Sequence, residues 1–453
     1  MTKKWKTILV ALFSIVILIL AACSQPVEEP KEEVAPSEEE VLPTEAEEVE
    51  DSAPEESGEP ITLTFWFEGE APATFALFEE SFNRFEEANP GVTVEASVIP
   101  FEDMLRTMPM ALDGGTGPDI ATVPPLGNGT WRYAKADHLV ELTAIGQNAG
   151  WLEKIEPAAI EVNNSGTPGE IYGIPYEWTA VGVYYNKEVF NSLGLTPPTT
   201  FAEFEAILAA VKDAGITPVS VAALDGWPLT QVWSQLHHTL VPIDTIAKLE
   251  QLDPSVSYEN PGMITAAAKI QEWTELEYLD PNMLSTSFVD ANNLFLNGEV
   301  AMNVGGTWVQ ADFRQAPFEV GFFAMPQMDP DLPWHAGGHT PYDDIVIVDG
   351  PNTEKAIELL NYILSEENMA FWYNSGLLVP YLFATPSEPL DSLQADIFTL
   401  LHQTGPGYFM GVVDGEVNDA ITAAMQGLVA GDLSPEEAMA SIQAIYGVKS
   451  ESQ

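Results

Sequence analysis

The residues with the most evident chemical potential are tryptophans that stand beside acidic side chains. The chain has 11 tryptophans, and several lie at the ends of predicted elements instead of inside an apolar repeat. Glu177 precedes Trp178, and Asp225 is followed by Gly226 and Trp227. Flat rings can cover the C–H faces of a neutral sugar, while carboxylates, amides and backbone groups bind its hydroxyls. This pairing predicts a binding surface for a polyhydroxylated molecule.

Acidic pairs offer a second chemistry, because a glycosidase uses two carboxyl groups at one bond. Glu68 with Glu70, and Asp343 with Asp344, are such pairs, but each is local in sequence and has no distinguishing context. Acidic pairs are also common in a chain whose formal net charge is −53. We therefore expect no catalytic residue and no enzyme activity.

Histidines could instead indicate a metal receptor, which needs several ligands that converge. His237 and His238 are adjacent, so on a helix their side chains would point about 100° apart. His335 and His339 are separated by Ala336-Gly337-Gly338, which favours a loop. The chain has no phosphate-binding loop, no nucleophile elbow and a single cysteine. We expect neither a metal nor a cofactor.

Strands and helices must alternate to position these groups. Residues 61–67 form a β-rich run, and phenylalanines at 75, 78, 82 and 85 then follow a helical spacing. Asn89-Pro90-Gly91 ends that helix, and a strand begins at Val92. Thr200 with Glu203 forms a capping box, and Ser434-Pro435 begins another helix. This alternation predicts open α/β sheets, arranged in two domains.

The front of the chain has the features of an export signal. Lysines at 3, 4 and 6 precede an apolar run from Ile8 to Leu20, which is shorter than the roughly 20 residues of a membrane span. Leu20-Ala21-Ala22-Cys23 resembles a bacterial lipobox. That resemblance implies a signal peptide over 1–22, cleavage before Cys23 and lipid, including palmitate, on that residue. An ordinary signal peptide or a short anchor remains the alternative.

The composition indicates a disordered segment near the front of the chain and limits the charge of the ligand. Residues 24–60 are rich in glutamate and proline, so together with Cys23 we interpret 23–60 as a disordered acidic tether. The net charge of −53 opposes nucleic acid, anionic lipid and anionic ligands. It is compatible with a neutral or cationic solute, or with a salty habitat.

Several motifs, in order, resemble the extracellular solute-binding proteins of sugar ABC transporters, the family of maltose-binding protein. Five motifs in register cover essentially all of 61–453. The segments that carry the resemblance are Gly114-Gly115-Thr116-Gly117-Pro118-Asp119-Ile120, 171–176 with 183–190, 295–302 with Gly305-Gly306-Thr307-Trp308, 319–326 with Gly337-Gly338-His339, and 355–360 through Gly376 and Pro380.

The resemblance implies the fold of a periplasmic binding protein, in which two α/β lobes are joined by a hinge with the ligand between them. Mapped onto this chain, the first lobe holds 61–175 and 318–350, and the second holds 176–317 and 351–453. Closure of the lobes would trap the ligand.

The resemblance also implies a set of ligand-binding residues. Trp308 matches a position where the family stacks a sugar ring, and Glu68 and Glu70 follow the first strand, where it places hydroxyl-binding groups. Asp119 is instead expected to cap a turn. No aromatic follows Asp119 at the position expected from maltose-binding protein, although Trp131 is a substitute, so we do not expect a maltodextrin. The full set is Glu68, Glu70, Thr122, Glu177, Trp178, Thr179, Asp225, Trp227, Trp308, Gly338, His339, Tyr342, Asp343, Tyr408 and Phe409.

These features together predict an exported, lipid-anchored receptor. It would be a monomer that captures a small neutral sugar or oligosaccharide and delivers it to ABC permease subunits, and it would contact the membrane through the lipid on Cys23. A polyol or a cationic solute remains open, as does a tethered lectin or adhesin without a transporter. The tether would keep the receptor close to its permease.

Overall fold

The computed structural model describes residues 60–69, 71–125, 129–157, 159–160, 164, 169–382, 391–405, 407–408 and 414–451. The chain divides into two compact units, Met1–Ser57 and Gly58–Gln453, and every described residue belongs to the second. The predicted signal peptide, Cys23 and the acidic tether up to residue 59 lie outside the described residues. Within the described part, no helix combines the length and the apolar character needed to cross a membrane.

The first lobe is built on a five-stranded sheet with the order β2-β1-β3-β9-β4. Strands β1, β2 and β3 are parallel, while β9 runs antiparallel to both β3 and β4. The carboxyl ends of β1, β3 and β4 and the start of β9 consequently meet at one edge. The strands are β1 Ile61–Glu68, β2 Val92–Ile99, β3 Ile120–Val123, β4 Gly173–Thr179 and β9 Thr340–Ile347.

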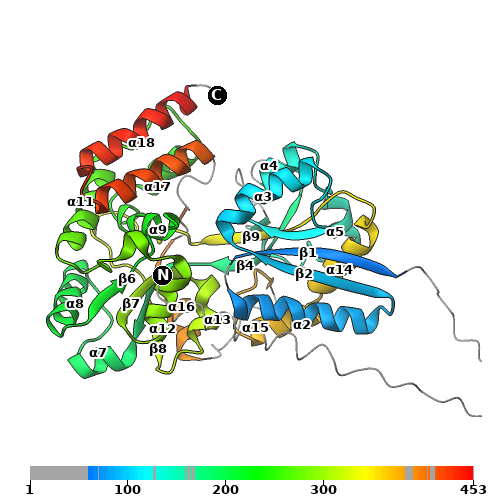
Figure 1. The fold of residues 1–453 in the computed structure, drawn as a ribbon, viewed down its shortest axis with the longest axis horizontal. Helices are drawn as coiled ribbons and strands as arrows, with labels where there is room; N and C mark the ends of the chain where they lie inside the picture. The colour runs from blue at the N-terminus through cyan, green and yellow to red at the C-terminus, as the bar shows by residue number, and fades with distance from the viewer. Residues whose placement is uncertain are drawn as a thin grey trace, which may run out of the picture. The chain divides into compact units, whose positions relative to one another are not determined.

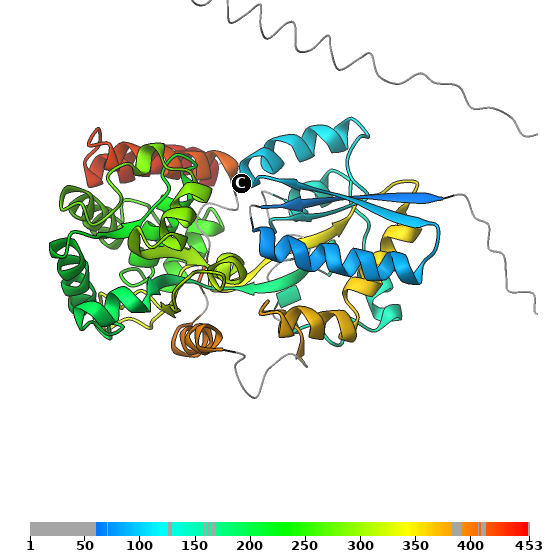
Figure 2. The same ribbon diagram turned by 60° about the horizontal axis from the view of Figure 1, so that its bottom comes forward.

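Helices cover both faces of this sheet. The α2 side contains Phe78 and Phe82, and α14 and α15 lie on the same side as α2 and contribute Leu359 and Trp372 to that core (Figures 1 and 2). The opposite face packs against methionines and Leu112 of α3 and against Tyr133 of α4. These helices are α2 Pro72–Ala88, α3 Phe101–Asp113, α4 Thr130–Lys135, α5 Thr143–Ala149, α14 Thr353–Ile363 and α15 Glu366–Asn374.

The second lobe is built on a four-stranded sheet with the order β6-β7-β5-β8. One face packs on the helices that contribute Phe204, Trp233 and Ile421, and the other on α12, α13 and α16. Its elements are β5 Val181–Asn186, α7 Lys187–Leu193, α8 Phe201–Asp213, β6 Thr217–Ser220, α9 Trp227–His237, α10 Ile243–Glu250, α11 Pro261–Glu275, η2 Met283–Ser285, α12 Phe288–Leu296, β7 Val300–Gly306, η3 Thr307–Val309, α13 Gln310–Phe313, β8 Val320–Phe323, α16 Ser392–Gln403, α17 Gly415–Val429 and α18 Pro435–Ser450.

The local predictions agree with these elements. The β-rich run is β1, and the phenylalanine repeat is α2, with Phe78, Phe82 and Phe85 buried. The predicted capping box is present at the start of α8, and α18 begins at the predicted Ser434-Pro435, where the structure adds a second capping box with Glu437. The mixed α/β fold with two lobes is therefore confirmed.

The boundaries of the lobes differ from the predicted ones. β8 pairs with β5 in the second sheet, although 318–350 was expected in the first lobe. β4 stays in the first sheet as far as Thr179, and the change of sheet occurs at Ala180. Helices α14 and α15 belong to the first lobe, although 351–453 was expected in the second, because their apolar faces pack against α2 and β9. The chain also changes lobe between β8 and β9 and between α15 and α16.

Candidate functional site

Four of the predicted residues meet at the edge of the first sheet where the strand ends converge. We call Glu68, Thr122, Glu177 and Asp343 the strand-end cluster; they come from β1, β3, β4 and β9 respectively. The Thr122 hydroxyl accepts a hydrogen bond of 2.8 Å from the backbone amide of Glu68. Thr122 is fully buried, so its role is to hold the end of β1 and hence the position of Glu68. The carboxyl ends of strands in open α/β sheets are a common place for ligands.

The carboxyl groups of the cluster are strongly desolvated. Glu177 is 1% exposed, and among the described residues neither of its carboxylate oxygens has a hydrogen-bond partner. Burial raises the pKa of Glu177 well above its usual value, and the charge of Asp343 raises it further. Burial likewise raises the pKa of Asp343, with a further contribution from Asp344, while a hydrogen bond with Tyr176 acts in the opposite direction. Glu177 and Asp343 thus contribute desolvated carboxyl oxygens to the cluster.

Asp343 also has an uncommon backbone conformation. Its φ is +58°, although it lies inside strand β9. Residues other than glycine rarely adopt this left-handed region, and such strain is concentrated at functional sites. The neighbouring Asp344 has a different environment, because its carboxylate accepts a 2.6 Å hydrogen bond from the Thr130 hydroxyl. The two adjacent carboxyl groups therefore have different environments.

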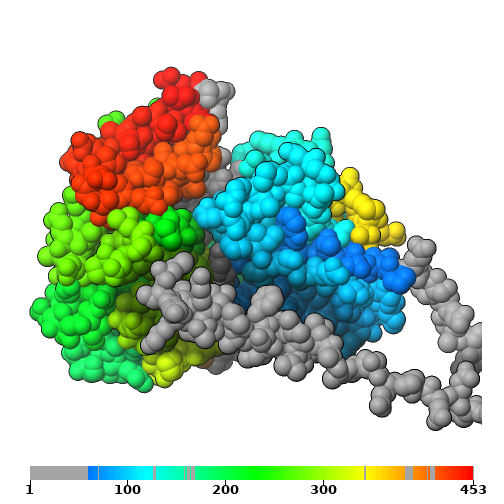
Figure 3. All heavy atoms as spheres, in the orientation of Figure 1, coloured from blue at the N-terminus to red at the C-terminus, as the bar shows by residue number. Residues whose placement is uncertain are grey.

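Two predicted tryptophans come together on the second lobe. The rings of Trp227 and Trp308 are 6.0 Å apart in an edge-to-face arrangement, and both are partly buried. Gly306 makes this possible, because a Cβ there would lie 1.9 Å from the Trp308 ring. The ring of Phe101, at the start of α3, lies 6.1 Å from that of Trp227, so α3 meets α9 at this point (cyan against green in Figure 3).

Contacts between the lobes bring Trp308 close to the end of β1. The Trp308 carbonyl accepts a hydrogen bond of 3.5 Å from the hydroxyl of Thr74 in α2. The amide of Ala73 donates to the Asp312 carboxylate at 3.2 Å. Helix α2 begins only four residues after Glu68, at Pro72. The backbone of Trp308 in the second lobe therefore contacts the helix that follows β1 in the first.

Other predicted residues are used by the structure itself. The Asp225 carboxylate accepts a hydrogen bond from the Phe288 amide at the start of α12. The Thr179 hydroxyl lies 2.6 Å from the Thr340 carbonyl and 3.2 Å from that of Gly338. The Gly338 amide donates to the Tyr408 carbonyl at 3.2 Å. These groups tie the crossing segments together.

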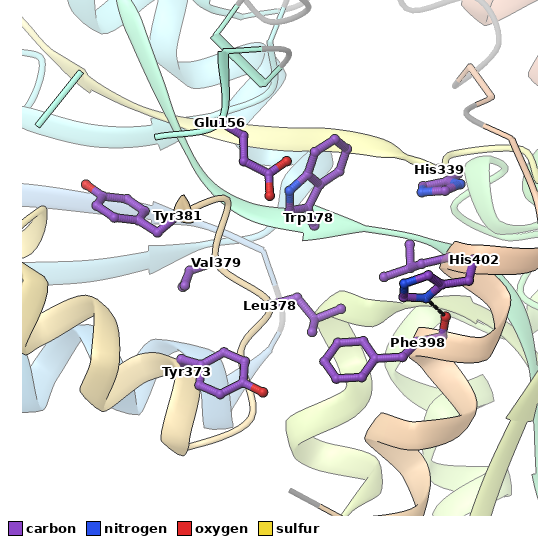
Figure 4. Close-up of a pocket in the computed structure, with 10 residues that line it drawn as sticks. Glu156, Trp178, His339, Tyr373, Leu378, Val379, Tyr381, Phe398 and His402 are labelled. Atoms are coloured by element: carbon purple, nitrogen blue, oxygen red, sulfur yellow. Dashed lines mark hydrogen bonds between the residues drawn. The ribbon is translucent and has the colours of Figure 1, made fainter. Parts of the chain in front are cut away.

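Trp178 and His339 lie away from the strand-end cluster. Consecutive residues of a strand point to opposite faces, so Trp178 is on the other side of β4 from Glu177. There Trp178 and His339 line a cavity of about 280 Å³ together with Glu156, Tyr373 and Phe398 (Figure 4). We call this the hinge cavity, because its walls come from both lobes and from the crossing strands.

Three predicted ligand residues cannot be assigned to the strand-end cluster or to the hinge cavity. Glu70, Phe409 and the side chain of Tyr342 lie outside the described residues. Tyr408 is 39% exposed, and its amide donates to His238 Nε2 at 3.2 Å.

Asp119 has a structural contact, although not the predicted turn cap: its carboxylate accepts hydrogen bonds of 2.7 and 2.8 Å from the amide and hydroxyl of Thr64 in β1. The adjacent rings of His237 and His238 are stacked 4.6 Å apart, and His238 Nδ1 contacts the Ser234 carbonyl at 2.8 Å. In the described part of the chain, no group of three or more histidine, cysteine or acidic side chains could hold a metal ion.

Sequence reasoning missed several residues. Tyr176 interacts with Asp343, and its place directly before Glu177 in the crossing motif was a usable signal. Glu156, Tyr373 and Phe398 come from three distant segments, so no spacing could have grouped them.

Comparisons with known proteins are consistent with this arrangement. The family described as "Bacterial extracellular solute-binding protein" matches residues 69–370. The chain is similar to the "Multiple sugar-binding protein" of Streptococcus mutans, with 25% identity over 261 residues, which are 55% of this chain and 59% of that protein. The chain is also 23% identical to the "sn-glycerol-3-phosphate-binding periplasmic protein" of Salmonella typhimurium, over 70% of this chain and 74% of that one. A solved "Chitin oligosaccharide binding protein" superimposes with a TM-score of 0.77 at 21% identity, over 87% of this chain and 100% of that one.

Proposed function

The chain belongs to the bacterial extracellular solute-binding proteins, and from that premise we propose that it captures a neutral carbohydrate and delivers it to an ABC importer. This is a family of exported binding proteins. The named sugar-binding relative and the chitin oligosaccharide-binding neighbour support the carbohydrate assignment. Both similarities are distant, and the matched region spans 59% of the streptococcal protein.

One arrangement carries the proposal: desolvated carboxyl groups at the strand ends of the first lobe and a pair of tryptophans on the second, with Trp308 in contact with α2 of the first lobe. Glu177 and Asp343 supply carboxyl oxygens for hydroxyl groups, and these hydrogen bonds strengthen if the carboxyl groups ionise on binding. Trp227 and Trp308 supply flat apolar surface for the C–H faces of a ring. The binding site we propose therefore consists of the strand-end cluster and this tryptophan pair.

The same acids disfavour an anionic ligand. The Salmonella relative is named for a phosphorylated solute. A phosphate brought to the strand-end cluster would meet Glu177 and Asp343, whose pKa values are already raised because burial and neighbouring acids disfavour a further negative charge. The net charge of −53 acts in the same direction at longer range. We therefore assign a neutral sugar in preference to a sugar phosphate.

Binding without chemical conversion and attachment by lipid are further parts of the proposal. The membership of a binding-protein family supports the first, and incubation with oligosaccharides that released reducing ends would contradict it. The lipobox-like Leu20-Ala21-Ala22-Cys23 supports a lipid anchor on Cys23. A single acyl chain anchors weakly, so we expect more than one chain on this residue.

A thermal-shift screen of the protein against monosaccharides and oligosaccharides tests the assignment. A sugar that binds only the folded state raises the melting temperature, by an amount that corresponds to about 2.7 kcal/mol at a hundred times its dissociation constant. Sugar phosphates, amino acids and divalent metals serve as the comparison sets. A shift from one of those sets, with none from any neutral sugar, would overturn the proposed ligand class.

A further inference from the structure

The hinge cavity has a chemical character of its own, separate from that of the strand-end cluster. Its volume is about 280 Å³, and its walls come from the first lobe, from the crossing strands and from α16. The aromatic side chains of Trp178, Tyr373, Tyr381 and Phe398 line it, and Leu378 and Val379 lie between them in Figure 4. Among the described lining residues, Glu156 contributes the one carboxyl group, which lies beside the Trp178 ring.

The hydrogen-bond donors that line the hinge cavity are already used within the protein. The Tyr381 hydroxyl donates to the Leu364 carbonyl at 3.1 Å, and the Tyr373 hydroxyl to Gln394 Oε1 at 3.4 Å. Burial raises the pKa of Glu156, and a hydrogen bond from the indole of Trp178 to its carboxyl group acts in the opposite direction.

The two imidazoles that line the cavity, His339 and His402, also use one nitrogen each. His339 Nδ1 contacts the Gly405 carbonyl at 3.2 Å, and His402 Nδ1 contacts the Phe398 carbonyl at 2.6 Å (dashed in Figure 4). A neutral imidazole that donates from Nδ1 keeps only an acceptor at Nε2. Burial lowers the pKa of His339, so this ring is neutral at pH 7. The cavity therefore offers acceptors and aromatic faces.

The groups that line the hinge cavity do not suit a sugar. A hexose presents several hydroxyls, each of which needs an acceptor and can accept in turn, and a site with few free polar groups would leave some of them unpaired. It does not suit an anion either, since within the described residues no lysine or arginine lines the cavity. Arg314 acts on Tyr373 electrostatically, but it is paired with Asp391 at 2.7 Å.

We infer that the hinge cavity is a second binding site, for a small organic cation of the alkylammonium class. Aromatic faces attract such a cation through their quadrupoles, and one carboxylate supplies the counter-charge. The negative potential of the whole chain concentrates cations near its surface. This inference does not depend on sugar binding, because Glu156 and Trp178 lie across β4 from Glu177.

Calorimetric titration of the full chain with choline tests this inference, with 3,3-dimethylbutan-1-ol as the probe of the same shape without the charge. We expect choline to saturate one site and the neutral alcohol to bind at least about tenfold more weakly. Equal affinity for the two probes would show a merely apolar cavity and would overturn the inference.

Two variants locate the site. Glu156→Gln keeps the size of the side chain and should weaken choline binding at least about tenfold, whereas Glu153→Gln, an exposed acid on the same segment, should not change it. Tyr373→Leu, which removes one aromatic ring from the cavity wall, should also weaken choline binding. If Glu156→Gln and Glu153→Gln weakened choline binding equally, or if the heat of choline binding never reached saturation, choline would be acting only as a counter-ion. Either result would contradict the site. Glu156→Gln should leave sugar affinity unchanged, so failure of this inference and failure of the proposed function are distinguishable.

Discussion

Replacing Glu177 by glutamine should stabilise the folded protein at neutral and alkaline pH. The native carboxyl group is 1% exposed and, within the described residues, neither of its oxygens has a hydrogen-bond partner. Burial, followed by the charge of Asp343, raises its pKa well above the usual value. Glutamine fills nearly the same volume and has no charge, so the substitution removes the free-energy cost of burying an ionised carboxylate.

The size of the effect follows from proton linkage. In the unfolded chain a glutamate titrates near about 4.3, whereas in the folded protein Glu177 titrates at a higher pH. Between these two values the folded state binds more protons, so the free energy of unfolding of the native protein falls as pH rises. Each unit of elevation corresponds to about 1.4 kcal/mol. Glu177→Gln should therefore gain at least about 1.4 kcal/mol over the native protein near pH 8, and should gain nothing near pH 4.

Urea unfolding at a series of pH values measures this difference. Glu141→Gln is the matched control, because the Glu141 carboxylate accepts hydrogen bonds from the amides of Thr143 at 2.8 Å and Ile171 at 3.3 Å. Burial alone would raise the pKa of Glu141, but these hydrogen bonds lower it. Glu141→Gln should thus lower the free energy of unfolding at pH 8, and should lower it less as the pH falls. A stability difference between Glu177→Gln and the native protein that does not grow with pH would refute the reasoning.

The same substitution should weaken sugar binding. A hydrogen bond to a charged group contributes about 1.5–3 kcal/mol, which corresponds to roughly a 10- to 150-fold change in affinity. Glu177→Gln should therefore be more stable and bind less well, the trade-off expected of a binding residue held in an unfavourable environment.

Four further substitutions separate binding, packing and anchoring. Trp308→Ala should lower sugar affinity at least about tenfold in calorimetry while far-UV circular dichroism stays native; unchanged affinity would remove this ring from the site. Gly306→Ala, whose Cβ would stand 1.9 Å from the Trp308 ring, should lower the melting temperature and change the near-UV spectrum, and a native spectrum would contradict the packing. Asp119→Ala should cost about 1–3 kcal/mol in urea unfolding, because the Thr64 amide loses its partner, and should leave sugar affinity intact; a loss of affinity would give Asp119 a binding role. Cys23→Ser should move the protein from the membrane fraction to the soluble fraction, and persistence in the membrane would contradict the lipid anchor.

Local sequence patterns predicted the elements well but could not assign all of them to a lobe. The spacing of Phe78, Phe82 and Phe85 defines one apolar stripe, and that stripe is the buried face of α2. The apolar face of α14, with Leu359, is equally regular, yet periodicity does not say which sheet it covers. Its partner is α2, nearly three hundred residues earlier in the chain, so only the folded structure places it in the first lobe.

The site was partly predictable for a related reason. Glu68 ends β1, and its place at the carboxyl edge of a parallel sheet follows from the alternating pattern, whereas Glu177 lies two residues before the end of β4 and reaches this edge through pairing with β9. The expectation that Glu177, Trp178 and Thr179 share one surface conflicts with the alternation of side chains along a strand. Trp178 accordingly lies in the hinge cavity, where its neighbour Tyr373 comes from a segment almost two hundred residues away.

Calorimetry of sugar binding in buffers with different ionisation enthalpies tests the central claim most directly, because it reports both the affinity and the protons exchanged. Glu177 is already fully buried, so a sugar adds little desolvation, whereas hydroxyls that donate to its carboxylate lower its pKa. We predict saturable binding of a neutral sugar with release of protons near neutral pH, and a smaller release in Glu177→Gln. The absence of binding by any neutral sugar, or binding with no proton release in the native protein, would contradict a sugar site at the strand-end cluster.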